Sequence, residues 1–269
     1  MDMKWQTINE DCTGVVVHDK ELFAGCKGII KVYDLSSKTL LREIGEEVLV
    51  NWVFGLVIHK NTLLATDQTN KLHIFSIDGQ HRKSFKIDGL WNGFGLAIHN
   101  KKLFICDASR RCIQVVNPDT CELLKTIKCY DIEENSKDRP HFVTSNRPHF
   151  ITPANNRLYT TECGKSTVKV MDEHGIILGQ FSVYKPTGIA VHGKDIIISN
   201  YGENQVCLYR HRKMVKVLLE CFNPYGICVT DTGQIIVAAN KIHISGMVNI
   251  VILYFIYQFK NKNTHNPAS

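Results

Sequence analysis

Short apolar segments separated by polar turns follow one another along most of the chain. In five places a glycine begins a unit made of an apolar segment, a polar turn and a second apolar segment. These units are GVVVHDKELFAG from Gly14, GLVIHKNTLLATD from Gly55, GLAIHNKKLFICD from Gly95, GIAVHGKDIIISN from Gly188 and GICVTDTGQIIVAA from Gly226. Two short apolar segments joined by such a turn predict a β-hairpin.

The hairpin units recur at a nearly constant spacing. Their glycines lie 41, 40, 93 and 38 residues apart, so the long interval has room for one more unit and an insertion. That unit is HFITPANNRLYTTE from His149, in which Phe150 takes the place of the glycine. Two further apolar segments follow each of the first five units, as IIKVYDL and LLREI follow the first. Four short strands about every 40 residues predict an all-β, six-bladed β-propeller of four-stranded antiparallel blades.

The last unit is incomplete at the C-terminal side. After Ile227–Val229 and Ile235–Ala238, the apolar run Val248–Tyr254 is the segment expected to supply a third strand. The N-terminal segment KWQTI, residues 4–8, has the same pattern as the fourth strands LLREI and LLKTI. We therefore expect the N-terminal strand to complete the last blade and close the ring, which removes an open sheet edge.

The repeat predicts one domain over residues 1–257, followed by a C-terminal tail over residues 258–269. The six blades are expected at about residues 12–47, 53–90, 93–130, 147–184, 185–222, and 223–254 together with 3–9.

The segment KPTGIAVHGKDIIISNYGENQVCLY, residues 185–209, resembles an NHL repeat, and NPYGICVTDTGQIIVAAN, residues 223–240, resembles another. The resemblance implies a six-bladed propeller. It also implies a role in recognising proteins or RNA, as in the C-terminal domains of tripartite-motif proteins. The RING and B-box modules of those proteins have no counterpart in this sequence, because it contains no Cys/His set with zinc-ligand spacing. Ubiquitin-ligase activity is therefore not implied.

The amino-acid composition excludes few classes of function. With 32 Lys and Arg against 26 Asp and Glu, the net charge is +6, and the sequence lacks the clustered basic residues of a dedicated nucleic-acid-binding protein. We expect no binding to DNA. The ten cysteines form no C-x-x-C pair and lie mostly in or beside apolar segments, which favours reduced thiols in a core. The N-terminus has no apolar signal core, and we expect a cytoplasmic protein.

The most apolar segment, MVNIVILYFIYQF over residues 247–259, is shorter than the roughly 20 residues that a membrane-spanning helix needs. Its β-branched and aromatic residues favour a buried strand. We therefore expect no membrane association.

Two recurring polar positions were candidates for metal binding. Histidines end the first strand of four units, at His18, His59, His99 and His192. Short acceptor side chains end the second strand, at Asp67, Asp107, Glu162 and Asn200. The histidines belong to different blades, and acids at a strand end commonly accept hydrogen bonds from the following turn. We therefore expect no metal and no cofactor.

The loops that enter the inner strands predict a binding face, because a rigid scaffold leaves its loops free for function. Aromatic side chains occupy the position before the inner strands, and basic side chains occupy the neighbouring turns. The predicted binding face consists of Phe54, Phe94, His149 and Tyr225 together with Lys71, Arg110, Arg111 and Lys165. The aromatic residues either pack between blades or present a surface to a ligand.

The sequence contains no nucleophile elbow, phosphate-binding loop or dinucleotide fingerprint, and no catalytic residue is identified. It therefore predicts a non-catalytic scaffold that binds a protein partner and is not an enzyme. One alternative is a propeller that binds single-stranded RNA by base stacking and phosphate contacts. A second alternative is a cation-dependent, lactonase-like hydrolase that uses the ring of acids and amides.

Overall fold

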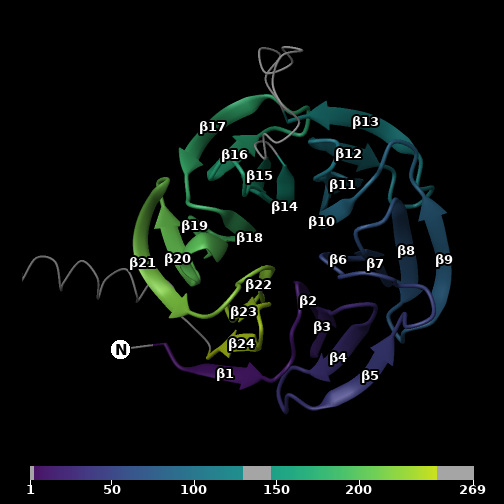
Figure 1. Ribbon diagram of the computed structural model, residues 1–269, viewed down its shortest axis with the longest axis horizontal. Coiled ribbons are helices and arrows are strands. Elements are labelled where there is room, and N and C mark those ends of the chain that lie inside the picture. Colours follow the sequence, from purple (N-terminus) through teal and green to yellow (C-terminus); the bar gives the residue numbers. More distant parts are fainter. Residues whose placement is uncertain (1–2, 130–146, 247–269) are drawn as a thin grey trace, which may run out of the picture.

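The structure is a computed structural model that describes residues 3–129 and 147–246. These residues form six sheets of four antiparallel strands, arranged around a central axis like the blades of a propeller (Figure 1). The predicted all-β fold and its six blades are confirmed.

One strand of each sheet lies nearest the axis (Figure 1). These innermost strands are β2 (Gly14–His18), β6 (Gly55–His59), β10 (Gly93–His99), β14 (Pro148–Ala154), β18 (Pro186–His192) and β22 (Ile227–Val229). The second strands are β3 (Glu21–Gly25), β7 (Thr62–Thr66), β11 (Lys102–Asp107), β15 (Arg157–Glu162), β19 (Asp195–Asn200) and β23 (Ile235–Val237).

The third strands are β4 (Ile30–Asp34), β8 (Lys71–Ser76), β12 (Cys112–Val116), β16 (Thr167–Met171), β20 (Gln205–Arg210) and β24 (Ile242–Ser245). The outermost strands are β5 (Leu40–Ile44), β9 (His81–Lys86), β13 (Leu123–Lys128), β17 (Ile177–Ser182), β21 (Lys213–Glu220) and β1 (Trp5–Ile8). A short 3-10 helix, η2 (Tyr201–Glu203), follows β19.

Burial falls from the middle of each blade to its outer edge. The second strands are buried on both faces, because each sheet packs against the sheets on either side; Leu63, Ile105 and Ile198 are fully buried. This explains why their sequences are continuously apolar rather than alternating. The outermost strands expose residues such as Leu124 and Met214.

The ring closes through the N-terminal strand, as the sequence predicts. Strand β1 pairs antiparallel with β24, from Trp5 opposite Ser245 to Ile8 opposite Ile242. The first strand of the chain is thereby joined to the last blade in one sheet, and it covers the edge of β24.

The third strand of the last blade differs from the expectation. It is β24, which follows β23 after a short connection, and not the run Val248–Tyr254, which lies outside the described residues. Strand β24 alternates two fully buried isoleucines, Ile242 and Ile244, with the half-buried His243 and the buried Ser245. Because polar and apolar residues alternate in β24, its sequence predicts a strand less strongly than the more apolar run that follows.

Five of the inner strands have, at or near their start, a glycine that meets the backbone of the next blade. A Cβ at any of these glycines would lie 2.8 Å or less from a carbonyl oxygen of that blade, which is too close for a side chain. The contacts are Gly14 with Phe54, Gly55 with Phe94, Gly95 with His149, Gly188 with Tyr225 and Gly226 with Thr13. The recurring glycine of the sequence is therefore the contact that lets the blades converge on the axis.

Removal of residues 1–8 is expected to destabilise the whole ring, because it exposes the edge of β24. We expect the midpoint of thermal unfolding to fall by about 10 °C and aggregation on heating to increase. Removal of residues 1–3 alone, which leaves β1 intact, is the matched control. Equal midpoints for the two truncations, measured by circular dichroism, would contradict a stabilising role for β1.

The substitution Gly55→Ala is expected to lower the free energy of unfolding by about 2–3 kcal/mol, because the added methyl collides with the Phe94 carbonyl oxygen and the Thr66 hydroxyl. In Gly246→Ala, the new methyl would meet only the Lys4 carbonyl oxygen, at 3.8 Å. Urea denaturation should show a much smaller change for this second variant, and similar losses for both would disprove the packing argument.

Candidate functional site

A cavity of about 310 Å³ lies at the centre of the ring, at the end where the inner strands begin. Its walls come from five blades. The lining residues are Phe54, Gln68, Phe94, His149, Phe150, Cys163, Thr187, Tyr201 and Tyr225. We call this cavity the mouth pocket.

Most of these residues occupy one repeated position, directly before the glycine position of each inner strand. In blade order the six side chains at this position are Thr13, Phe54, Phe94, His149, Thr187 and Tyr225. The two threonines are small, and each bonds the next blade: Thr13 donates to the Val53 carbonyl at 2.9 Å and Thr187 to that of Pro224 at 2.7 Å. Thr187 therefore leaves space at its place in the ring, and the mouth pocket includes that space.

The aromatic rings of the mouth pocket also pack on one another. The Phe54 ring lies 4.6 Å from that of Phe94, 6.3 Å from that of Phe150 and 5.7 Å from that of Tyr225, measured between centroids. Phe54 and Phe150 are buried, whereas Phe94 and Tyr225 are half-buried. The rings from blades 2, 3, 4 and 6 thus meet around the axis, and their exposed edges form the wall of the cavity.

The sequence analysis missed four lining residues, which are Gln68, Cys163, Thr187 and Tyr201. Gln68, Cys163 and Tyr201 come directly after the recurring acid or amide, which is Asp67, Glu162 and Asn200 respectively. Phe150 was noted for replacing the glycine but was not assigned to the site. The repeat register could have found all three turn residues, because equivalent turns in a propeller lie at the same end of the ring.

His149 is the ionisable group of the mouth pocket whose protonation is most altered. Burial, together with the positive charge of Arg147, lowers the pKa of its imidazole to about 4. Its Nδ1 atom is buried and has no hydrogen-bond partner among the described residues. The ring packs on Phe94, with centroids 5.1 Å apart. At neutral pH His149 is therefore an uncharged imidazole.

The Cys163 thiol and the Tyr225 phenol of the mouth pocket stay protonated at neutral pH. Burial raises the pKa of the Cys163 thiol above its ordinary value. Burial, with the nearby Tyr201, raises the pKa of Tyr225 to about 12. The Tyr201 and Tyr225 rings lie 5.4 Å apart. The pocket therefore combines apolar walls with the neutral polar groups of an imidazole, an amide, a thiol and two phenols.

The recurring acids mostly bind the turns around them. Asp107 accepts hydrogen bonds from the backbone N–H groups of Ser109 and Arg110 at 3.1 Å and of Trp91 at 2.8 Å. Asp67 accepts hydrogen bonds from the backbone N–H of Val50 at 2.9 Å and from the Thr69 hydroxyl at 2.6 Å. Burial alone would raise the pKa of Asp67, but hydrogen bonds from His73, Thr69 and Val50 lower it to about 2.

At the equivalent position in the next two blades the contacts differ. Glu162 pairs with Lys169 at 2.9 Å, and Asn200 donates to Glu203 at 2.7 Å. Within residues 3–129 and 147–246, no three His, Cys, Asp or Glu residues are grouped so that they could hold a metal ion. The four histidines His18, His59, His99 and His192 end the inner strands, at the opposite end from the mouth pocket.

The four basic residues of the predicted binding face do not line the mouth pocket. Lys71 is exposed at the start of β8, and the exposed Arg110 lies over the Trp91 ring, 5.5 Å from its centroid. Arg111 and Lys165 are half-buried and have interaction partners. The structure thus groups the four predicted aromatic side chains in one cavity and leaves the basic ones outside it. Binding of protein or RNA by this face stays a prediction.

No helix among the described residues has the length and apolar character needed to cross a membrane.

No protein-family model and no curated protein matches the sequence. Among solved structures, the chain is similar to virginiamycin B lyase from Staphylococcus aureus, at 15% identity and a TM-score of 0.63; the match covers 92% of this chain and 100% of the lyase. A streptogramin B lyase matches at 14% identity and a TM-score of 0.66, covering 92% of this chain and 98% of that one. A catalytically inactive virginiamycin B lyase from the same organism, solved with quinupristin, matches at 16% identity and a TM-score of 0.65, covering 92% and 100%.

These similarities correct two expectations of the sequence analysis. The predictions of a non-catalytic scaffold and of no enzymatic activity are wrong, because the solved propellers that match nearly the whole chain are enzymes. The error came from treating the repeat architecture as a sign of binding alone, whereas one fold can carry many functions. At these identities the likeness establishes the fold, and an identity with NHL or tripartite-motif proteins is not established.

Acidification is expected to destabilise the protein through His149. Its pKa is about 4 when folded and near 6.5 when unfolded, so the unfolded chain takes up the proton first as the pH falls. The stabilisation is fully present above about pH 6.5 and is lost towards pH 4, by up to about 3 kcal/mol. Urea denaturation at each pH should show a flatter dependence for His149→Phe than for the wild type. Parallel pH profiles would contradict the low pKa.

Proposed function

We propose that this chain is a propeller enzyme of the lyase or hydrolase type that acts on a small, largely apolar carbonyl compound bound in the mouth pocket. The observation that carries the proposal is the neutral His149 in the aromatic wall of that pocket. The proposal takes up the enzymatic alternative of the sequence analysis and moves the candidate chemistry from the ring of acids to the centre of the ring.

The composition of the mouth pocket favours a small ligand with an apolar or aromatic part. Its volume of about 310 Å³ is at the lower end of the range for ligand sites, and few polar groups interrupt its aromatic walls. No Asp, Glu, Lys or Arg lines it among the described residues. An uncharged ligand could therefore enter without leaving a charged group of the wall unpaired.

The proposed role of His149 is to accept a proton. A lyase removes a proton from carbon as a neighbouring bond breaks, and a hydrolase removes one from water as the water attacks a carbonyl; both need an unprotonated base. The low pKa keeps the imidazole unprotonated at neutral pH. The Tyr225 hydroxyl, with its raised pKa, stays protonated and could donate a hydrogen bond to the negative charge that develops on oxygen.

The names of the similar structures suggest which compounds to test first. They are lyases for virginiamycin B and streptogramin B, and one was solved with quinupristin. Their identity to this chain is 16% or less, so these compounds are a starting point, and simple aryl esters and lactones belong in the same panel.

In a chromatographic assay of that panel, the substitution His149→Gln should lower kcat by about 10²–10⁴-fold with little change in KM, because it removes the base and keeps the shape. The wild-type rate should stay level as the pH falls from 7 towards 5, which an imidazole of ordinary pKa would not allow. Parallel assays with EDTA and with added Mg²⁺ report any need for a divalent cation.

The matched control is His192→Gln, which changes an exposed histidine at the far end of an inner strand and should leave kcat unaltered. Full activity of His149→Gln would exclude the proposed base. Failure of the whole panel to bind, measured by fluorescence of the half-buried Trp52 that packs against the same aromatic core, would refute the substrate class.

A further inference from the structure

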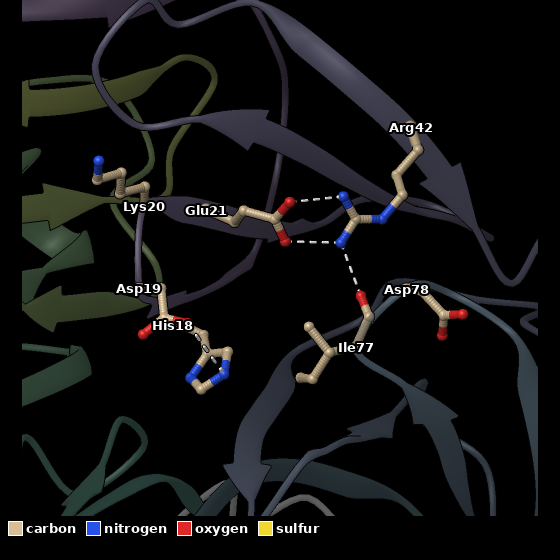
Figure 2. A pocket seen from close by; sticks show the side chains of 7 residues that line it. All are labelled: His18, Asp19, Lys20, Glu21, Arg42, Ile77 and Asp78. Atoms are coloured by element: carbon tan, nitrogen blue, oxygen red, sulfur yellow. Dashed lines mark hydrogen bonds and ion pairs between the residues drawn. The ribbon is translucent and has the colours of Figure 1, made fainter.

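The end of the ring opposite the mouth pocket is built from two kinds of turn. The turn between the first and second strands of one blade lies beside the turn between the third and fourth strands of the next. We call each such meeting of turns a seam. At the seam of blades 1 and 2, the Arg42 guanidinium binds both Glu21 oxygens, at 2.7 and 2.6 Å, and donates to the Ile77 carbonyl at 2.6 Å (Figure 2).

The next two seams are also matched in charge. At the seam of blades 2 and 3, Lys60 and His59 contact Asp119 at 2.7 and 3.0 Å. At the seam of blades 3 and 4, Lys102 contacts Glu173 at 3.0 Å. In each of the three seams a cation therefore meets a carboxylate.

The seam of blades 4 and 5 breaks this rule. It contains a cleft of about 360 Å³, lined by Asn155, Arg157, Tyr159, Val170, Val191, Gly193, Lys194, Ile196, His211 and Arg212. Its ionisable groups, apart from a phenol, are two arginines, a lysine and a histidine, and no Asp or Glu of the described chain lines it. Across this seam Asn155 donates a hydrogen bond to the Gly193 carbonyl at 3.3 Å.

Comparison of equivalent positions shows how the cleft arises. Arg157 begins the second strand of blade 4, where blade 1 has Glu21. Gly179 lies opposite Val170, where blade 1 has Arg42 opposite Val32. At the seam of blades 4 and 5, Arg157 thus takes the place of the acid Glu21. Gly179 takes the place of Arg42.

The absence of a side chain at Gly179 leaves room for a neighbour. The guanidinium of Arg212, from the turn of blade 5, lies where a Cβ of residue 179 would be. The nearby carboxylate of Asp195 does not neutralise the cleft, because Arg210 binds both of its oxygens at 2.6 Å.

We propose that the cleft between blades 4 and 5 binds a small organic phosphate. The cations of Arg157, Lys194 and Arg212 surround the position of the phosphate, which supplies the negative charge that carboxylates supply at the three seams described above. The apolar floor of Tyr159, Val170, Val191 and Ile196 takes the organic part.

The electrostatics of the empty cleft favour an anion. Three permanent cations share one cleft, and none of them has an ion-pair partner among the described residues. Their mutual repulsion is relieved when a dianion enters, and His211 adds a further positive charge when it is protonated. The arginine side chains also offer paired N–H donors that match phosphate oxygens.

The probe for the test is phenyl phosphate, with inorganic phosphate and phenol as its two halves, titrated by calorimetry at low salt. Phenyl phosphate should bind best, inorganic phosphate more weakly and phenol not measurably. Binding should weaken as NaCl is raised, because salt screens the cations. Equal binding of phosphate and phenyl phosphate would show that the floor contributes nothing and would overturn the organic part of the proposal.

The substitution Arg157→Glu recreates the acid of the first seam and should pair with the cations of the cleft. We expect it to weaken phenyl phosphate binding by at least about 100-fold, and Arg212→Gln by about tenfold. The matched control Lys60→Gln removes a cation of the seam between blades 2 and 3 and should leave the affinity unchanged.

Thermal melts establish that each variant is folded, and Arg157→Glu should melt no lower than the wild type because it removes a like-charge contact. Wild-type affinity in folded Arg157→Glu and Arg212→Gln, or no saturable binding to the wild type, would refute the site. His149→Gln should bind phenyl phosphate normally, so this result is independent of the function proposed for the mouth pocket.

Discussion

Close backbone contact around the axis is the constraint on which the rest of this structure depends. Five inner strands have, at or near their start, a glycine whose α-carbon faces a carbonyl of the next blade at a distance that excludes any side chain. This contact sets how closely the blades converge, and the apolar second and third strands then pack face to face behind it. A residue directly before such a glycine is consequently held at the axis, whatever its side chain.

That geometry explains why the mouth pocket is both a packed core and a cavity. Aromatic rings at the repeated position reach across the axis and contact one another, while Thr187 bonds the neighbouring backbone and leaves space. An imidazole placed in such a wall loses solvation and with it most of its affinity for a proton. Packing around the axis, together with the charge of Arg147, therefore keeps an imidazole uncharged at the centre of the ring.

The strands and blades could be predicted from the sequence, because they depend on local periodicity. The pocket-lining residues were predicted less completely, because they come together only when distant segments meet. The repeat of apolar segments and glycines gave the six blades, and the pattern of residues 4–8 gave the closing strand. The third strand of the last blade was misplaced because IHIS is less apolar than the run after it, although its isoleucines are fully buried. Gln68, Cys163 and Tyr201 were missed because their convergence depends on the ring geometry.

Both candidate sites include positions at which blade 4 departs from the repeat. At the axis, blade 4 has Phe150 where the other inner strands have glycine, and Phe150 lines the mouth pocket. At its outer strand, blade 4 has Gly179 where blade 1 has an arginine, and the basic cleft lies at that seam. Blade 4 still contacts blade 5, through the Thr161 hydroxyl and the Thr187 carbonyl at 2.6 Å. Because the ring tolerates these changes without losing that contact, blade 4 is the place where substitutions can create cavities while the other blades maintain the fold.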